Sequence, residues 1–460
     1  MTFNKINLIL IGAIFYCSLL QSQDKPNILL INIDDMGWRD VGFMGSKYYE
    51  TPNIDKLAAK GMVFPNGYAS AANCAPSRAN LFSGKYPQFH GVYTVGSSER
   101  GKSKHRKLVP VENKSTISND FKLLPQILKN NGYSTCHAGK WHISQDPLQK
   151  GFEVNIGGSH FGHPASYYPP YSNIDIDGDE YLTDVIMKKS IDFIKKAEEP
   201  FFLNYSPYAV HTPIQPIDSL SWKYKNKTNW KGQNNPGYAT MIENLDRNIG
   251  KLIHTLKEMS IFENTFIVFT SDNGGLYGIT QQKPLRAGKG SYYEGGIKVP
   301  FFFIWDDKIA SESKNEFPIS NIDLYPTILS VAGINQCKKL QLDGLDLSGL
   351  LTNQSTISER DLFWHFPVYL ERFSSNNENR DSLFRTRPGT IIQSGFWKLH
   401  YYYEDKDVEL YNLKEDISES TNLVTIYPKR SEKLLAKMKK WLLETNAEIP
   451  YKLNPEFETN

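Results

Sequence analysis

The stretch that most constrains the fold of this 460-residue chain is an unbroken apolar run, NILLINI, at residues 27–33. A strand that is apolar on both faces belongs in a sheet covered on both sides, as parallel sheets are. The run ends directly in Asp34 and Asp35. We therefore expect a buried strand whose carboxyl end presents two carboxylates.

Strand and helix patterns alternate along the chain after this first strand. Strands are predicted at 133–137, 201–205, 265–270 and 299–305, and helices at 52–60, 121–131, 180–197, 239–259 and 322–331. This alternation predicts an α/β fold, a doubly wound sheet sandwiched by helices.

The pattern changes near residue 356. Residues 397–403 and 408–411 are typical of paired antiparallel strands, and residues 429–445 have the pattern of an amphipathic, lysine-rich helix. We predict a large domain at 23–355 and a smaller C-terminal α+β subdomain at 356–460.

The N-terminal 22 residues have the pattern of a secretory signal peptide. Lys5 precedes a mainly apolar run at 6–20, which is marginal for a membrane span but fits the apolar region of a signal. The bulky residues before Cys17 suit a lipoprotein signal poorly. We expect an exported protein, periplasmic or secreted, with no stable membrane span.

Composition excludes several classes. A net charge of +2 indicates neither nucleic-acid nor membrane binding, and four cysteines in so long a chain exclude a disulfide scaffold. The sequence leaves open whether Cys136 and Cys337 pair.

The most specific motif is CAPSR at 74–78, followed by LFSGK at 81–85. Pro76 suits the first turn of a helix, so we expect Cys74 just before a helix N-terminus, where an anion would meet free N–H groups. Arg78, about one turn later, would point a cation at the same place. A lone cysteine is usually a buried structural residue, but this pattern with Gly84 behind it is much rarer by chance.

With this motif the sequence resembles the formylglycine-dependent sulfatases, in particular secreted bacterial enzymes acting on polysaccharides. The similarity covers residues 27–413 and implies an alkaline-phosphatase-like fold. In that family a maturing enzyme oxidises the motif cysteine, here Cys74, to formylglycine (3-oxoalanine). This chain has Ser83 where the family usually has Thr, and Asn73 where the family usually has an apolar or hydroxyl-bearing residue. Residues 132–142, GYSTCHAGKWH, match a second family signature, and RAGKGSYYEGGIKVP at 286–300 resembles the segment that carries a family lysine, here Lys289.

Polar clusters follow four predicted strands, and the carboxyl ends of such strands gather ligands. The clusters are Asp34 with Asp35, Lys140 with His142, His211, and Asp272 with Asn273. Three carboxylates and an amide oxygen repel one another without a divalent cation, and oxygen ligands favour Ca²⁺ or Mg²⁺ over Zn²⁺. In the resembling family the cation is calcium, and the matching ligands are Asp34, Asp35, Asp272, Asn273 and the formylglycine at 74.

A cationic ring for an anionic group of the substrate is expected from Lys140, His142, His211 and Lys289. The resemblance implies that hydrated formylglycine attacks sulfur while Lys140, Lys289, Arg78 and the cation neutralise charge. It further implies that His211 protonates the leaving sugar oxygen and that His142 takes the proton whose removal releases sulfate.

Two alternatives remain. A phosphatase or phosphodiesterase on the same scaffold typically uses Ser or Thr with two zinc ions, whereas this chain offers a cysteine and oxygen ligands. A carbohydrate-binding protein that has lost turnover is the second alternative, although every expected catalytic position is filled.

The substrate is expected to be a sulfated oligosaccharide or polysaccharide. We favour material from algal polysaccharides, ulvan or carrageenan-type galactan, with animal glycosaminoglycans as the alternative. Candidate sugar contacts are His365, Arg387, His163, Tyr168 and Trp38.

Overall fold

The computed structural model describes residues 25–335, 337–373 and 378–458. The predicted signal peptide at 1–22 lies outside these ranges. Within them, every helix is too short or too polar to cross a membrane.

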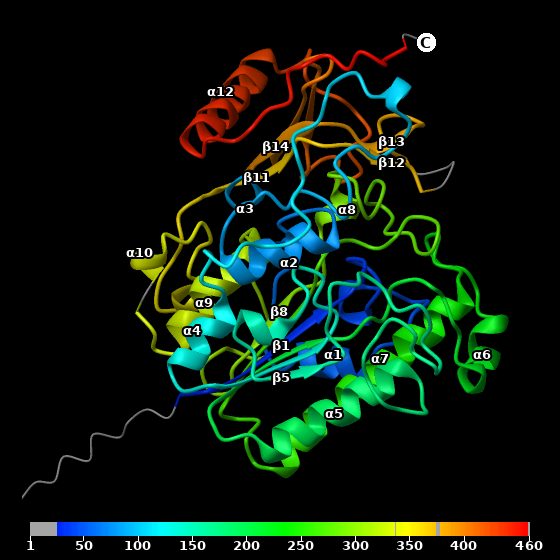
Figure 1. Ribbon diagram of the computed structural model, residues 1–460, viewed down its shortest axis with the longest axis vertical. Coiled ribbons are helices and arrows are strands. Elements are labelled where there is room, and N and C mark those ends of the chain that lie inside the picture. Colours follow the sequence, from blue (N-terminus) through cyan, green and yellow to red (C-terminus); the bar gives the residue numbers. More distant parts are fainter. Residues whose placement is uncertain (1–24, 336, 374–377, 459–460) are drawn as a thin grey trace, which may run out of the picture.

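A central eight-stranded sheet confirms the predicted α/β class (Figure 1). In sheet order its strands are β5 (Val154–Ile156), β4 (Ser134–Gly139), β6 (Phe201–Ser206), β1 (Asn27–Ile33), β7 (Thr265–Ser271), β8 (Phe302–Ile304), β2 (Met62–Val63) and β9 (Ser313–Lys314). All seven residues of β1 are buried, and β1 runs parallel to both β6 and β7. The apolar run that opens the chain is therefore the centre of the sheet.

One side of the sheet departs from the parallel pattern, because β8 pairs antiparallel with β7 and with β2. The chain between β7 and β8 contains one four-residue helix, α8 (Glu294–Ile297), among its described elements. Since this segment stays at the carboxyl edge of β7, β8 enters the sheet from that edge and must run the opposite way.

Helices cover both faces of the sheet, as expected (Figure 1). Leu29 and Ile31 of β1 pack in one core with α1, α5 and α7, whereas Ile28 and Leu30 pack in a second core with α2, α4 and α9. The helices of the first core are α1 (Pro52–Ala58), α5 (Leu182–Lys196) and α7 (Pro236–Glu258). Those of the second core are α2 (Cys74–Ser83), α4 (Leu124–Asn130) and α9 (Leu324–Val331).

The C-terminal region forms a four-stranded antiparallel sheet in the order β11-β14-β15-β16. Its strands are β11 (Asp361–Phe366), β14 (Gly389–Ser394), β15 (Trp397–Tyr402) and β16 (Val408–Asn412), and one face is covered by α12 (Pro428–Glu444). The predicted antiparallel pair and the predicted helix are β15, β16 and α12. The domain boundary at 355/356 stays a prediction.

The remaining α-helices and β-strands of the described chain are short. Two short sheets pair β3 (Gly67–Tyr68) with β10 (Ile319–Ser320), and β12 (Leu370–Glu371) with β13 (Phe384–Thr386). The short helices are α3 (Pro87–His90), α6 (Asp218–Lys225), α10 (Cys337–Leu340) and α11 (Ser348–Leu351).

A buried ion cluster joins the C-terminal sheet to the segment between β7 and β8. The Lys398 ammonium of β15 lies 2.8 Å from Glu294 Oε1 and 3.0 Å from Glu419 Oε1, and all three side chains are fully buried. The backbone N–H of Glu294 also donates to Glu419. These bonds tie α8, which follows the Lys289 loop, to the C-terminal sheet.

We expect Lys398→Met to lower the free energy of unfolding by about 3–5 kcal/mol, because it removes the nearest cation from two buried carboxylates. Glu294 keeps the longer contact with Lys298, at 3.6 Å, and Glu419 keeps the contact with His400, at 3.4 Å. Urea denaturation followed by circular dichroism measures the change. Lys437→Met is the control, since its ion pair with Asp361 is partly exposed and should contribute less than about 1 kcal/mol. Similar losses for the two variants would contradict a structural role for the cluster.

Candidate active site

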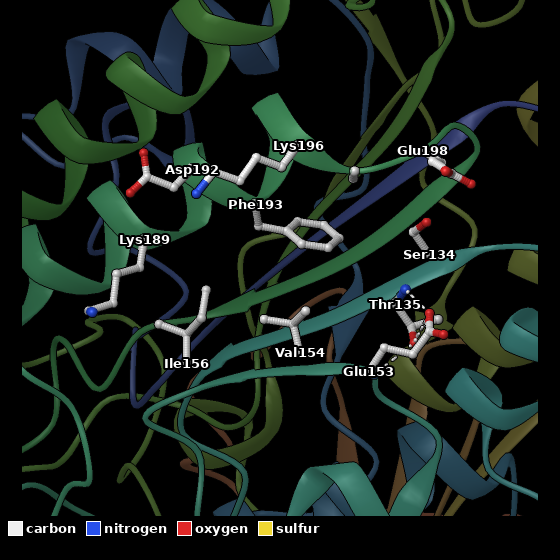
Figure 2. A pocket seen from close by; sticks show the side chains of 11 residues that line it. Ser134, Thr135, Glu153, Val154, Ile156, Lys189, Asp192, Phe193, Lys196 and Glu198 are labelled. Carbon is white, nitrogen blue, oxygen red and sulfur yellow. Dashed lines mark hydrogen bonds between the residues drawn. The ribbon is translucent and has the colours of Figure 1, made fainter.

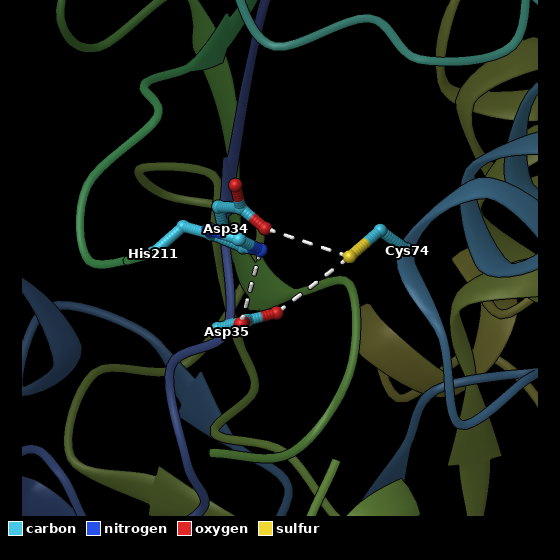
Figure 3. A group of neighbouring side chains, drawn as sticks. All are labelled: Asp34, Asp35, Cys74 and His211. Carbon is cyan, nitrogen blue, oxygen red and sulfur yellow. Dashed lines mark hydrogen bonds and ion pairs between the residues drawn. The ribbon is translucent and has the colours of Figure 1, made fainter. Parts of the chain in front are cut away.

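The cysteine of the CAPSR motif lies at the start of a wholly buried helix, α2. The helix begins at Cys74 itself, with Asn73 as the extended residue before it, so Cys74 is in the first turn and not just before it as expected. Its Sγ lies 3.8 Å from Asp34 Oδ1 and 3.6 Å from Asp35 Oδ1. Figure 3 shows the sulfur facing both carboxylates. His211 joins them, and one ligand atom from each of these four residues lies within 4.8 Å of the others.

Parallel pairing of β1 with β7 brings two acidic segments together. Ile33 is paired with Ser271, so Asp34 and Asp35 emerge beside Asp272 and Asn273. The Asp35 N–H donates to Asp272 Oδ1 over 3.2 Å, and the Asn273 amide donates to Asp35 Oδ1 over 2.9 Å. Sheet register therefore gathers the ligand set expected for a cation.

Two oxygens in this group fit a bound cation. Asp34 Oδ2 and Asn273 Oδ1 are buried, and neither has a hydrogen-bond partner among the described residues. A buried acceptor left unpaired is costly, and a divalent ion is a partner that carboxylate and amide oxygens share. The residues present thus suit a hard cation such as Ca²⁺ or Mg²⁺.

Lysines compensate the two carboxylates that follow β1, Asp34 and Asp35, unequally. Burial is the main cause that raises the pKa of Asp34 to about 7. The Lys140 ammonium, 2.7 Å away, lowers this pKa, but repulsion from the charges of Asp272 and Asp35 raises it again. Burial also acts on Asp35, but Lys289, followed by His211, outweighs it and holds the pKa of Asp35 well below its usual range. The Lys289 ammonium lies 2.7 Å from both Asp35 oxygens.

Arg78 mainly holds protein groups in place. Its Nε donates to Asp272 Oδ2 over 2.8 Å, and its Nη1 donates to Lys140 O and Ser206 Oγ. Its Nη2 is buried, has no hydrogen-bond partner in the described chain, and lies 4.0 Å from Asp34 Oδ1. The sequence predicted that the Arg78 guanidinium faces a bound anion. Nη2 is the nitrogen that remains available to bind one.

Two histidines that line the cavity, His142 and His211, offer proton-transfer groups. His211 Nδ1 donates to Thr212 O over 2.7 Å, so Nε2 faces Asp35 Oδ2 at 3.6 Å. His142 has a left-handed backbone (φ 71°), and its Nδ1 is buried without a partner in the described residues. Burial lowers the pKa of both rings, and Lys289 for His211 and Lys140 for His142 lower it further. Both rings are therefore neutral at pH 7 in this state.

A cavity of about 360 Å³ opens above these groups. It is lined by Asn73, Cys74, Val95, Arg100, His142, Gly162, His163, His211, Thr212, Leu276, Lys289, Leu370, Phe373 and Arg385. The sequence singled out His163, whose ring lies near that of His211, but it missed Arg100 and Arg385. Neither arginine belongs to a motif, and neither follows a strand of the central sheet, where the sequence predicted the site.

The other four candidate sugar contacts lie away from this cavity. Both ring nitrogens of buried His365 bond protein atoms, Thr390 Oγ1 and Glu448 O, which leaves none for a sugar hydroxyl. Arg387 is paired with Asp381 and Glu404. Trp38 donates to Pro65 O and lines a different hollow, and the hydroxyl of Tyr168 donates to Pro216 O.

A larger hollow of about 540 Å³ lies at the β5 edge of the sheet, beside α5 (Figure 2). Phe193, Val154 and Ile156 form its floor, and Lys189, Asp192 and Lys196 stand around it. It contains none of the clustered groups near Cys74, so size does not identify the reactive site here.

Known proteins match nearly the whole chain. The family model described as Sulfatase matches residues 26–334, and the one described as N-sulphoglucosamine sulphohydrolase, C-terminal, matches residues 288–448. A protein from Formosa agariphila named sulfatase is 32% identical over 97% of this chain and 94% of its own length. N-acetylgalactosamine-6-sulfatase from Homo sapiens is 32% identical over 75% of this chain and 69% of its own. The crystal structure of Ps i-CgsB, also solved in complex with k-i-k-neocarrahexaose, has a TM-score of 0.74 and 29% identity and covers 94% of this chain and 95% of that one.

We expect a divalent cation to stabilise the protein, by about 2.7 kcal/mol at a free concentration 100 times its Kd. The raised pKa of Asp34 means that its contribution to stability in the cation-free protein is present below pH 4 and lost as pH rises toward 7. The gain from Ca²⁺ over a chelator should therefore be larger at pH 8 than at pH 5. Thermal melts at both pH values measure it.

Asp34→Asn should abolish this cation-dependent gain, whereas Asp361→Asn, at a surface ion pair, should keep it. A melting temperature that does not respond to Ca²⁺, Mg²⁺ or chelator in the parent protein would contradict a cation site.

Proposed function

Because this chain belongs to the sulfatase family, we propose that it hydrolyses a sulfate ester on a carbohydrate, with formylglycine formed from Cys74 as the nucleophile. Family membership confirms the resemblance, the fold and the class of sulfuric ester hydrolases. The observation that carries the proposal is the position of the Cys74 Sγ, less than 4 Å from two aspartates that are themselves paired with Lys140 and Lys289. A maturing enzyme that modifies Cys74 is part of the proposal.

Calcium is the cation we propose, held by Asp34, Asp35, Asp272, Asn273 and the modified side chain at 74. The two unpaired oxygens, Asp34 Oδ2 and Asn273 Oδ1, support an oxygen-coordinated ion. When present, the hydrated aldehyde supplies a hydroxyl nucleophile and the cation lowers the pKa of that hydroxyl. His211 also lies in this cluster, but we assign its Nε2 to proton transfer.

The protein side chains then divide the remaining work. The charge of the sulfuryl oxygens is offset by Lys140, Lys289 and Arg78 Nη2. Their positions support this role, because the two lysines pair with the aspartates next to Cys74 and Nη2 has no partner among the described residues. His211 Nε2 gives a proton to the departing sugar oxygen, after the bound anion has raised the pKa of this buried ring. His142, which is neutral, accepts the proton that leaves the group at 74 when sulfate departs.

We propose a sulfated oligosaccharide from an algal polysaccharide, ulvan or carrageenan-type galactan, as substrate. The structure solved with k-i-k-neocarrahexaose and the Formosa sulfatase are similar to this chain over more than nine-tenths of its length. A glycosaminoglycan is the second candidate, supported by N-acetylgalactosamine-6-sulfatase and by the C-terminal family match. His163, exposed at the cavity wall, is our candidate sugar contact. Export to the periplasm or medium completes the proposal.

Replacing the nucleophile tests the reaction. Cys74→Ala should lose all release of sulfate from 4-nitrophenyl sulfate and from a panel of sulfated oligosaccharides followed by mass spectrometry. Cys136→Ala, which removes a buried thiol on β4, should remain active. The parent must first show formylglycine in its peptide mass. Parent protein that carries it and cleaves 4-nitrophenyl phosphate but no sulfate would support a phosphatase instead, and inert protein with retained glycan affinity would support a binding protein.

His211→Ala should lower kcat on a sugar sulfate by about 10²–10⁴-fold, because a sugar alkoxide must be protonated as it leaves. The loss should be far smaller on 4-nitrophenyl sulfate, whose phenolate leaves unaided. His254→Ala, an exposed histidine of α7, is the control and should change neither rate. Equal losses on both substrates would assign His211 another role.

A further inference from the structure

Arg385 on β13 reaches the active-site cavity from the C-terminal region. Its Nε donates to Glu371 O over 3.0 Å, and its Nη1 donates to Lys289 O over 3.3 Å. Both acceptors are neutral backbone carbonyls. The guanidinium thus lies beside the loop of Lys289, and its hydrogen bonds within the described part of the chain bring no negative charge.

The other cations of this cavity are neutralised by protein carboxylates. Lys289 is paired with Asp35, and Arg100 makes a forked pair with Glu371. Among the described residues lining the cavity, Arg385 is the lysine or arginine without a carboxylate within 4 Å. Burial and then repulsion from Arg100 lower the pKa of Arg385 to about 10, so the guanidinium is charged at neutral pH but poorly compensated.

The surroundings hold Arg385 in this position. Gly290 lies against it so closely that a Cβ at 290 would be 3.1 Å from Arg385 Cδ and Nη1 and 2.6 Å from Leu370. The Arg100–Glu371 fork fixes β12, whose backbone carbonyl holds Arg385 Nε. A long cation is therefore ordered at the cavity wall before any ligand arrives, which lowers the entropy cost of binding.

We propose that Arg385 forms a second anion subsite, which binds an acidic group of the substrate other than the sulfate being hydrolysed. The inference rests on the proposed sulfatase activity and extends it: the preferred substrate carries a second sulfate or a carboxylate near the scissile ester. An arginine suits both groups because its planar fork matches two oxygens at once. Lys140 and Lys289 pair with Asp34 and Asp35 next to Cys74, whereas Arg385 bonds backbone carbonyls, so the proposal gives the two anions separate partners.

The test compares Arg385→Met with the parent on matched substrates. These are 4-nitrophenyl sulfate, a monosulfated galactose oligosaccharide, the same oligosaccharide with a second sulfate, and a monosulfated oligosaccharide containing a uronic acid. We expect kcat/KM to fall roughly 10- to 100-fold, mainly through KM, on whichever doubly anionic substrate the parent prefers. On the two singly anionic substrates it should stay within about threefold. If kcat/KM falls on the disulfated oligosaccharide, the second group is a sulfate; if it falls on the oligosaccharide containing a uronic acid, the second group is a carboxylate.

Arg372→Gln is the matched control, since this exposed arginine of the same hairpin does not line the cavity and should leave all rates unchanged. Arg385→Lys, which keeps the charge without the fork, should recover part of the loss. An equal fall on 4-nitrophenyl sulfate would place Arg385 at the scissile sulfate and overturn the proposal, as would no change on any substrate. A parent carrying formylglycine but inactive on 4-nitrophenyl sulfate would instead refute the sulfatase activity itself.

Discussion

The burial of three carboxylates at one edge of the sheet is the constraint on which the rest of this structure depends. Asp34 and Asp272 are fully buried, and Asp35 is 2% exposed. Like charges in a medium of low dielectric constant repel strongly unless cations lie against them. Lys140, Lys289 and Arg78 supply those cations within the protein. Even so, the raised pKa of Asp34 and two unpaired oxygens leave a place for one more positive charge.

The compensating cations come from distant parts of the chain, which explains much of the architecture. Lys140 follows β4, Arg78 lies on α2, and Lys289 lies in the segment between β7 and β8. That segment must stay at the carboxyl edge to deliver Lys289, and as a result β8 runs antiparallel to β7. The buried cluster around Lys398 then joins the end of the same segment to the C-terminal sheet. The C-terminal region thus holds the segment of Lys289 in place, and it also contributes Arg385 to the cavity.

The cavity divides into a floor and a wall with different origins. Its floor is made by strand ends and the start of α2, where each position is set by sheet register or helix geometry. Its wall carries Arg100 and Arg385 from segments outside the central sheet. Groups on such segments can vary without disturbing the core, so the floor suits a common reaction and the wall suits the choice of substrate.

Local patterns in the sequence were enough to predict the buried strand β1, the alternation of strands and helices, and the gathering of polar groups at strand ends. These features depend on periodicity and on the rule that parallel strands end at one edge, and both are properties of short segments. Tertiary structure alone decided which further side chains reach the site. His365 and Arg387 look free in the sequence, but His365 bonds Glu448 O, 83 residues further along the chain, and Arg387 pairs with Asp381 and Glu404. Among the described residues, the hydrogen bonds of Arg385 go to backbone carbonyls. The physical reason is that pairing and exposure of a side chain depend on what packs against it from elsewhere in the chain, and no local pattern encodes those contacts.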